Sequence, residues 1–432
     1  MYDDLVEFLQ ESVTPFHAAA TAESWLRAAG FTRLEEADYW NLEPGKGYYT
    51  TRNGSSVVAW RVPQHAIGGW RIVASHSDSP SWKIKADTVE NDGCRRLSVE
   101  GYGGMIMSTW LDRPLTVGGR ALVKTEDGIE SRLVYLDRDL LVIPSLAIHF
   151  QRDINKGHTF NPQVDMQPLW GPAGSRTLTD LVAEELGVDT ADILDSDLQL
   201  VTRQAPTQIG PDGEFFMAPR IDDLECAATT LLGFLDASGE TDSACAPVWA
   251  MFDNEEVGSS TRQGADSSFL RDVLDRILNA IPHSAQAQGQ AFANSFVLSA
   301  DNAHAVHPNF ADKADPCNKV ILGKGVVVKV NASQKYTTSG LTGAIFKEIC
   351  RKNNVPVQVF ANRADLPGGS TLGNLQSHTV PVPMVDIGLA QLAMHSAVET
   401  AAVADADAMV RAVAGFYRVH LRSLGDARYT LE

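Results

Sequence analysis

The stretch Ala246-Pro-Val-Trp-Ala-Met-Phe252 is followed without a break by Asp253-Asn-Glu255-Glu256-Val-Gly258. An unbroken apolar run of this length predicts a strand that is buried on both faces, as in a parallel sheet. Acidic residues begin where this strand ends, and open α/β sheets bind their ligands beyond the carboxyl ends of the strands. This stretch therefore predicts both the class of the fold and the edge of the sheet where a site lies.

Three other buried strand patterns also lead into histidine or acidic residues. Trp70 to Ser75 is followed by His76 and Asp78, Ser295 to Ala300 by Asp301 and His304, and Pro383 to Gly388 by His395 a few residues later. A further acidic pair, Asp222-Asp223, precedes a helical pattern that starts near Leu224. Since parallel strands end at the same edge of a sheet, we expect these groups to converge although they are far apart in the chain.

Helical patterns alternate with these strands, which predicts a mixed, mainly parallel sheet covered by helices on both faces. Between residues 85 and 213 the sequence pattern changes to short strand-like runs separated by turns. We therefore predict an α/β catalytic domain made of residues 1–84 and 214–432, interrupted by a β-rich domain at 85–213. Further expectations are two helices between Asp3 and Gly30, a hairpin at Asn53-Gly54, and a final long helix from Ala397 to Leu421.

The composition limits the class of partner. The 432 residues include 36 Lys and Arg against 54 Asp and Glu, a net charge of −18, whereas nucleic-acid binding needs a basic face. The first residues lack the basic region of a signal peptide, and no apolar run approaches the roughly 20 residues of a membrane span. The five cysteines are scattered and form no C-x-x-C pair. We expect a cytoplasmic protein with no nucleic-acid or membrane partner.

The residue types at the strand ends suit a metal. Two histidines with several carboxylates and no nearby cysteine are ligands for zinc, manganese or cobalt. Neighbouring side chains point in different directions, so that one of Glu255 and Glu256 can bind metal while the other handles protons. Asp78 lies two residues after His76, where its carboxylate can accept the imidazole N–H.

Each of these features alone is more often structural, because most acidic residues are simply solvated at the surface. The arrangement at four strand ends favours a site. Other chemistries lack their motifs: Gly368-Gly-Ser370-Thr-Leu-Gly373 is one residue too long for a nucleophile elbow, and no phosphate-binding or dinucleotide-binding glycine pattern is complete.

At these residues the sequence resembles the aspartyl aminopeptidase family of di-zinc metallopeptidases over nearly its whole length. The resemblance is carried by Ser75-His-Ser-Asp-Ser-Pro80, Tyr102-Gly-Gly, Ser108-Thr-Trp-Leu-Asp-Arg113, Ile143-Pro-Ser-Leu-Ala-Ile-His149, Arg220-Ile-Asp-Asp, Asp253-Asn-Glu-Glu-Val-Gly-Ser259, Ser299-Ala-Asp-Asn-Ala-His-Ala-Val-His-Pro-Asn309, Val328-Lys-Val-Asn331, Gly368-Gly-Ser-Thr371 and Met394-His-Ser396. Their order and joint presence are specific to the family.

The resemblance implies two zinc-class ions held by His76, Asp222, Glu256, Asp301 and His395. Asp222 would bridge the ions, and Glu255 would be the general base. We also count Asp78 among the catalytic residues, as the partner of His76. Family members release N-terminal Asp or Glu from peptides, through a water activated by the two ions. Manganese or cobalt can replace zinc in such sites.

The resemblance also places Lys329 and Tyr336 in the substrate pocket, and we assign His304 and Gly369 to the same pocket. It places His149 in a β-rich domain that dimerises and reaches a neighbouring subunit's site, in a family that assembles into tetrahedral dodecamers. Asp223 stands where Asn is common and Ile221 where Leu is common, and we expect neither to touch the inferred ligands. Two alternatives stay open: a di-metal aminopeptidase or amidohydrolase of broader or neutral specificity, and a catalytically dead assembly scaffold.

Overall fold

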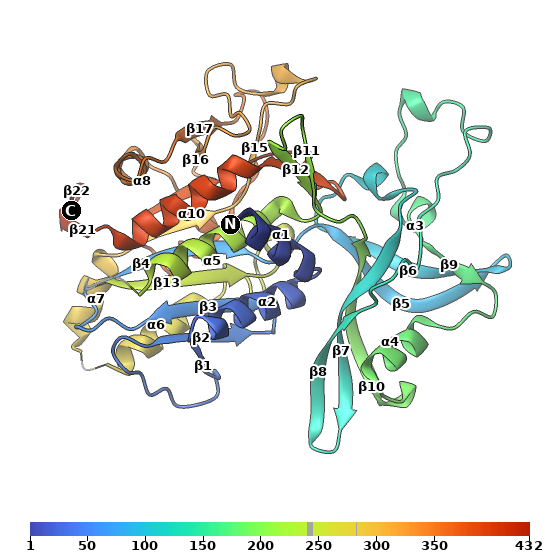
Figure 1. The fold of residues 1–432 in the computed structure, drawn as a ribbon, viewed down its shortest axis with the longest axis horizontal. Coiled ribbons are helices and arrows are strands. Elements are labelled where there is room, and N and C mark those ends of the chain that lie inside the picture. The colour runs from blue at the N-terminus through green and yellow to red at the C-terminus, as the bar shows by residue number, and fades with distance from the viewer. Residues whose placement is uncertain (240–244, 282) are drawn as a thin grey trace.

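The computed structural model describes residues 1–239, 245–281 and 283–432. Two large sheets dominate it, one of nine strands and one of six. In Figure 1 the six-stranded sheet stands to one side of the nine-stranded sheet and its covering helices. Among the described residues no helix combines the length and the apolar character needed to cross a membrane. The predicted α/β class with a β-rich part is confirmed.

The nine-stranded sheet carries the strand ends that the sequence singled out. Its order is β1 (Thr32–Arg33), β2 (Gly47–Arg52), β3 (Ser56–Arg61), β13 (Cys245–Phe252), β4 (Gly69–His76), β14 (Phe296–Ala300), β18 (Met384–Gly388), β16 (Val326–Val330) and β17 (Val357–Ala361). The central strands β13, β4, β14 and β18 run parallel, and β16 is antiparallel to β18. Phe252 pairs with His76, so that β13 and β4 end level with each other.

Helices cover both faces of this sheet. One face packs against α1 (Tyr2–Glu11), α2 (Pro15–Ala28), α5 (Ile221–Ala237), α8 (Gly340–Lys352) and α10 (Val403–Arg418). The other packs against α6 (Phe269–Asn279), α7 (Ala285–Ala293) and the short α9 (Leu372–Gln376). Within β13, Trp249 and Met251 pack in the hydrophobic core on the α5 side of the sheet. Val248 and Ala250 pack in the core on the α6 side. An apolar residue is therefore needed at every position, which is why the strand lacks alternation.

The six-stranded sheet is antiparallel and buries one core. Its order is β8 (Gly128–Tyr135), β7 (Leu115–Thr125), β10 (Ile193–Thr202), β5 (Ser81–Asn91), β6 (Cys94–Tyr102) and β9 (Leu169–Pro172), with α4 (Leu178–Leu186) packed against it. The sheet thus begins at Ser81 and its last strand ends at Thr202. We propose residues 85–213 as an inserted unit built around this sheet, and the two segments 1–84 and 214–432 as the other unit.

Local signals near the N-terminus are confirmed. Helices α1 and α2 form as expected, with Pro15 in the first turn of α2. The hairpin between β2 and β3 turns at Asn53 and Gly54, whose φ angles of 61° and 65° are those of a type I′ turn. Two further features are the short helix α3 (Pro162–Asp165) and a C-terminal pair of strands, β21 (Leu421–Gly425) and β22 (Arg428–Leu431).

The expected final helix starts later than predicted. It begins at Val403 because residues 399–402 form strand β20. This strand belongs to a five-stranded sheet of β11 (Thr207–Ile209), β12 (Phe215–Ala218), β20 (Glu399–Ala402), β19 (Ala390–Leu392) and β15 (Ala303–His304). Phe216 pairs with Ala401 across it. The four residues Glu-Thr-Ala-Ala are too few to show a helical or a strand period, and pairing with a distant strand decides the structure.

Candidate metal centre

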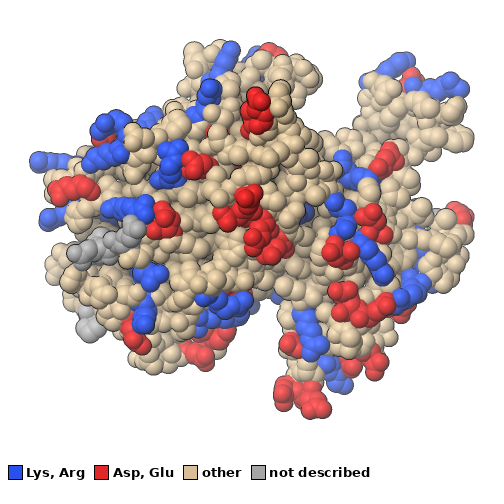
Figure 2. Space-filling model, viewed as in Figure 1, with Lys and Arg blue, Asp and Glu red and all other residues tan. Residues whose placement is uncertain are grey.

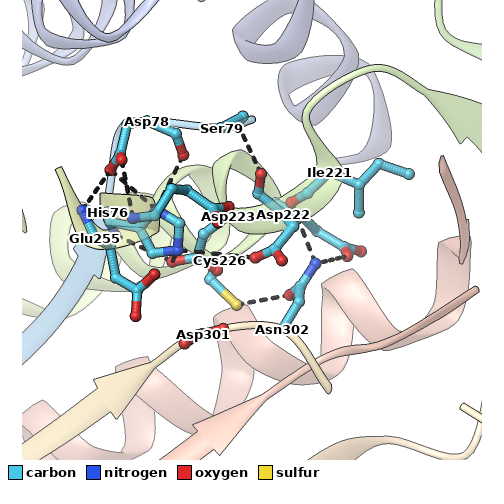
Figure 3. Close-up of polar contacts among 12 residues, drawn as sticks. His76, Asp78, Ser79, Ile221, Asp222, Asp223, Cys226, Glu255, Asp301 and Asn302 are labelled. Carbon is cyan, nitrogen blue, oxygen red and sulfur yellow. Dashed lines mark hydrogen bonds and ion pairs between the residues drawn. The ribbon is translucent and has the colours of Figure 1, made fainter. Parts of the chain in front are cut away.

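The candidate site lies beyond the carboxyl ends of β4, β13 and β14. His76 is the last residue of β4, and Asp301 directly follows β14. Glu255 and Glu256 lie in a single 3-10 turn after β13, entered through Asn254 in a left-handed conformation. Figure 3 shows His76, Glu255 and Asp301 close to Asp222 and Asp223, which lie at the start of α5. The structure therefore brings the strand-end groups together.

Among the described residues, two groups of side chains have the geometry to hold a metal ion. The ligand atoms of His76, Asp222, Asp223 and Asp301 all lie within 4.8 Å of one another. The same holds for Asp222, Glu256 and His395. All five ligands that the resemblance implies belong to these groups, and Asp222 belongs to both.

The two carboxylate oxygens of Asp222 face different groups. Its Oδ1 lies 3.8 Å from Nε2 of His76, and its Oδ2 lies 3.3 Å from Nε2 of His395. The same His395 nitrogen is 3.3 Å from Oε2 of Glu256. A carboxylate placed in this way can bridge two ions.

The electrostatics of the cluster also suit cations. One oxygen each of Asp222, Asp223 and Glu256 is buried without a hydrogen-bond partner. Burial raises the pKa of Glu256 and of Asp301, because the charged carboxylate loses its hydration. Bound divalent cations would supply the missing partners, and the nitrogen and oxygen donors suit zinc-class metals. The residues present therefore fit the metal that the sequence implies.

Glu255 belongs to neither ligand group, although it lines the same cavity as both. Burial raises the pKa of Glu255 to about 8, so this carboxylate binds a proton more readily than an exposed glutamate does. Its neighbour Glu256 points to the second ligand group. The expected division of labour between the two glutamates thus has a geometric basis.

Asp78 organises the groups around it. His76 Nδ1 lies 3.0 Å from the carbonyl oxygen of Asp78 and 3.3 Å from its Oδ1. The backbone N–H groups of Glu255 and Glu256 donate to Oδ1 and Oδ2 of Asp78, at 3.0 and 3.1 Å. Burial opposes the charged form, but the hydrogen bonds to Asp78, with that of His76 the largest, lower its pKa overall. Asp78 therefore remains an ionised acceptor that holds a histidine and two glutamates.

The expectation that Asp223 would not touch the inferred ligands was wrong. Its Oδ2 accepts a hydrogen bond from the backbone N–H of His76 at 3.1 Å and lies 3.9 Å from His76 Nε2. Burial, together with the nearby carboxylates of Asp301 and Asp222, raises its pKa well above the ordinary value. The error arose because adjacency to Asp222 does not reveal where the second carboxylate turns. No such contact with a ligand side chain is found for Ile221, whose carbonyl accepts from Asn302.

A cavity of about 210 Å³ opens onto the cluster. Besides the ligand residues and Glu255 it is lined by Lys329, Tyr336, Gly369 and His304. It is smaller than the roughly 300–1,000 Å³ of most ligand pockets, so it suits one residue of a peptide. His149 does not line this cavity, and lies in an exposed loop between β8 and β9. Within a single chain, four of the five residues predicted to bind substrate therefore line the cavity.

Lys329 is the buried cation of this cavity. Its Nζ lies 3.2 Å from Oδ1 of Asp301 and 5.6 Å from the ring centre of Tyr336. Burial alone would lower the pKa of Lys329, but the carboxylate of Asp301 raises it above the ordinary value. The ammonium group therefore stays charged.

A larger cavity, of about 820 Å³, lies between α8 and the loops at 331–335 and 361–368. None of the described residues that line it is a histidine or a carboxylate. By volume alone the larger cavity would be the candidate site. The smaller cavity is the better candidate, because the histidine and carboxylate groups line it.

Sequence reasoning missed two supporting residues. Glu399 accepts hydrogen bonds from the backbone N–H of Asp222 at 3.0 Å and of His395 at 2.6 Å. Asn302 donates to Glu225 Oε2 and to Gln391 Oε1 beneath the cluster. Only the position of Asn302 next to Asp301 was a local hint, and nothing near Glu399 in the sequence marks its role.

A mainly parallel sheet with histidine and carboxylate groups beyond its strand ends is the arrangement of a metal-dependent hydrolase. The chain belongs to the aminopeptidase I zinc metalloprotease (M18) family, whose model matches residues 8–417. It is therefore a metallo-aminopeptidase by family.

Individual relatives agree with this assignment. The chain is 41% identical over 414 residues to a probable M18 family aminopeptidase 2 from Clostridium novyi (strain NT), covering 93% of this chain and 95% of that protein. It resembles a cryo-EM structure of the Ape4 and Nbr1 complex with a TM-score of 0.93 at 33% identity, over 96% of this chain and 84% of that one. It also resembles the S. cerevesiae mApe1 dodecamer, with a TM-score of 0.85 at 26% identity, over 96% and 95% of the two chains.

Proposed function

We propose that this aminopeptidase releases acidic N-terminal residues, Asp and also Glu, from peptides. The observation that carries the proposal is Lys329, a charged ammonium group buried in a cavity that accommodates one residue. A buried cation favours a substrate carboxylate over a neutral side chain of similar size. Tyr336, His304 and Gly369 are assigned to the walls around that side chain.

In the proposed mechanism His76, Asp222 and Asp301 would hold one divalent ion, and Asp222, Glu256 and His395 would hold a second. When bound, the two ions would make water nucleophilic at neutral pH and polarise the scissile carbonyl. Glu255 takes the proton of the attacking water and passes it to the leaving amine. Asp78 orients His76 and fixes the backbone of both glutamates, so that these side chains are in place before substrate binds.

The overall charge does not account for an acidic preference. At −18 the chain repels acidic peptides at long range, and Figure 2 shows acidic and basic side chains interspersed over the face in view. The preference must therefore come from the pocket, through Lys329 and the bound ions.

One observation favours the broader-specificity alternative. Lys329 pairs with Asp301, and a lysine that only holds this ligand in place would not select acidic substrates. The test is release of the first residue from matched peptides that begin with Asp, Glu, Ala, Leu or Lys, with chelator and with zinc, manganese or cobalt restored.

We expect chelator-sensitive cleavage confined to Asp and Glu. Equal cleavage of all five peptides would replace the acidic specificity with the broader one. If no peptide is cleaved with any of the metals, the catalytically dead assembly scaffold is the alternative that remains.

We further propose that the chain forms a homo-oligomer, by analogy with the mApe1 dodecamer. The loop around His149 exposes Leu146, Ile148 and Phe150, and Phe150 is 80% exposed in the single chain. Such a patch suits a contact with a second copy. A dodecamer of this 46.8-kDa chain would have a mass of about 560 kDa, which light scattering after size-exclusion chromatography measures.

The buried thiols of Cys226 and Cys350 agree with a reducing, cytoplasmic setting.

A further inference from the structure

The turn Tyr102-Gly103-Gly104 starts at the last residue of β6, so it is attached to the six-stranded sheet. The sequence singled out this motif, but neither the ligand set nor the substrate pocket uses it. In the structure it reaches across to the candidate metal centre of the other unit, which gives the inserted sheet a direct connection to the site.

Tyr102 acts on Asp78. Its hydroxyl donates to Oδ2 of Asp78 at 2.6 Å and accepts from Nδ2 of Asn254 at 2.8 Å. The carboxylate that receives this bond also receives the backbone N–H groups of Glu255 and Glu256. Tyr102 therefore helps to orient the carboxylate that holds the proposed base and one proposed ligand.

The rest of the turn contacts the second ligand group. The carbonyl oxygen of Gly104 accepts a hydrogen bond from Nδ1 of His395, which leaves Nε2 of that ring to face Asp222 and Glu256. Gly103 has a φ of 70°, and a Cβ added to it would lie 3.1 Å from Cβ of Glu256. Glycine is thus needed at this position for the turn to approach the ligand.

We propose that the turn Tyr102–Gly104 is a positioning element for both halves of the metal centre, so that the inserted sheet supports turnover as well as assembly. This inference rests on the proposed metal site and general base. A partner of a metal ligand typically changes metal affinity or activity by 10–100-fold when it is removed. Tyr102 is half-buried and a phenylalanine fills the same space, so its hydroxyl can be removed with little change in packing.

The test compares Tyr102→Phe and Gly103→Ala with matched controls in the full-length protein. Tyr135→Phe removes a hydroxyl from β8 in the same sheet, and Gly101→Ala adds a methyl group in β6 where its neighbours stay at least 3.6 Å away. Zinc affinity is measured on metal-depleted protein by competition with a chromophoric chelator. The values of kcat and KM are measured on a peptide that begins with Asp, and thermal unfolding is followed for each variant.

We expect Tyr102→Phe to weaken zinc binding, lower kcat, or both, by roughly 10–100-fold, with KM within about twofold. Gly103→Ala should act in the same direction, while both controls stay near the unchanged protein. Zinc affinity and kcat of Tyr102→Phe both within about twofold of those of Tyr135→Phe would overturn the inference. A loss explained by lower folding stability alone, with normal zinc affinity and kcat per folded molecule, would also overturn it.

The zinc measurement separates this inference from the proposed function. If the unchanged protein binds zinc but does not cleave acidic peptides, the proposed specificity fails while the zinc affinities of the variants still decide the role of the turn.

Discussion

Glu255 and Glu256 are adjacent, yet their surroundings give them different chemistry. Glu256 faces His395 and Asp222, whereas Glu255 stands outside both ligand groups with a pKa raised to about 8 by burial. The difference arises because one 3-10 turn points the two side chains in different directions, while Asp78 holds both backbones.

We predict that Glu255→Gln lowers kcat by about 10²–10⁴-fold, the usual contribution of a general base. Metal affinity should stay close to that of the unchanged protein, because Gln keeps the size and Glu255 is not in a ligand group. Steady-state kinetics and chelator competition measure the two quantities. Glu256→Gln is the control and should weaken metal binding instead, and a Glu255→Gln variant with near-normal kcat would refute the assignment of the base.

Lys329→Met separates the two roles open to that lysine. If the ammonium group recognises the substrate, kcat/KM for peptides beginning with Asp should fall by at least about 10-fold relative to peptides beginning with Leu. If Lys329 only holds Asp301, all substrates should lose activity in the same proportion and metal affinity should change. The measurement is the ratio of kcat/KM for the two peptides, with zinc affinity recorded beside it.

At the scale of elements, the site depends on how α5 packs on β13. Asp222 lies in the first turn of α5, and Glu255 and Glu256 follow β13. Farther from the site, in the interior of both elements, the indole Nε1 of Trp249 donates to the hydroxyl of Thr230 at 3.0 Å, and both residues are fully buried. This bond ties the helix to the strand inside the core.

We predict that Thr230→Val lowers the free energy of unfolding by about 1–3 kcal/mol, because it leaves the buried indole N–H without an acceptor. Denaturant titration measures this change. Thr229→Val is a matched control, since Thr229 is also buried but donates only to carbonyls of its own helix. An equal loss in both variants would show that the bond to Trp249 contributes nothing specific.

At the scale of the whole molecule, the buried acids make the metal-free protein sensitive to pH. Burial raises the pKa of Glu255 and of Glu399 to about 8 and that of Asp253 to about 7. The folded state therefore holds protons that the unfolded state releases near pH 4. The free energy of unfolding therefore falls as pH rises from about 4 to about 8, because over this range the folded state binds more protons than the unfolded state.

His395 adds to the same trend. Burial opposes its charge, but Asp222 raises its pKa to about 9, so its contribution to stability is present below pH 6.5 and lost as pH rises through 9. We predict that the melting temperature of chelator-treated protein falls by several degrees between pH 5.5 and 8.5. Zinc should reduce this fall, because a bound cation favours ionised carboxylates and neutral histidine. A melting temperature that rises with pH in the absence of metal would contradict the prediction.

The sequence by itself determined the central strands of the large sheet and the histidine and acidic residues at their ends. Mainly apolar runs at β4, β13 and β14 specify strands buried on both faces, and histidine or acidic residues at their ends mark one edge of the sheet. The Asn53-Gly54 turn is equally local, because its φ angles are set by the two residues themselves. Such features are readable because local periodicity and turn chemistry encode them.

The tertiary structure alone decided which side chains meet. Asp78 and Glu255 are 177 residues apart, and Asp222 and Glu399 also 177, so no local pattern predicts either contact. Tertiary packing also decides three other features. These are the contact of Asp223 with His76, the pairing of β20 with β12, and the contact of Tyr102 with Asp78 from another sheet. Each depends on how separately encoded elements pack against one another, which fixes distances that the order of residues along the chain leaves open.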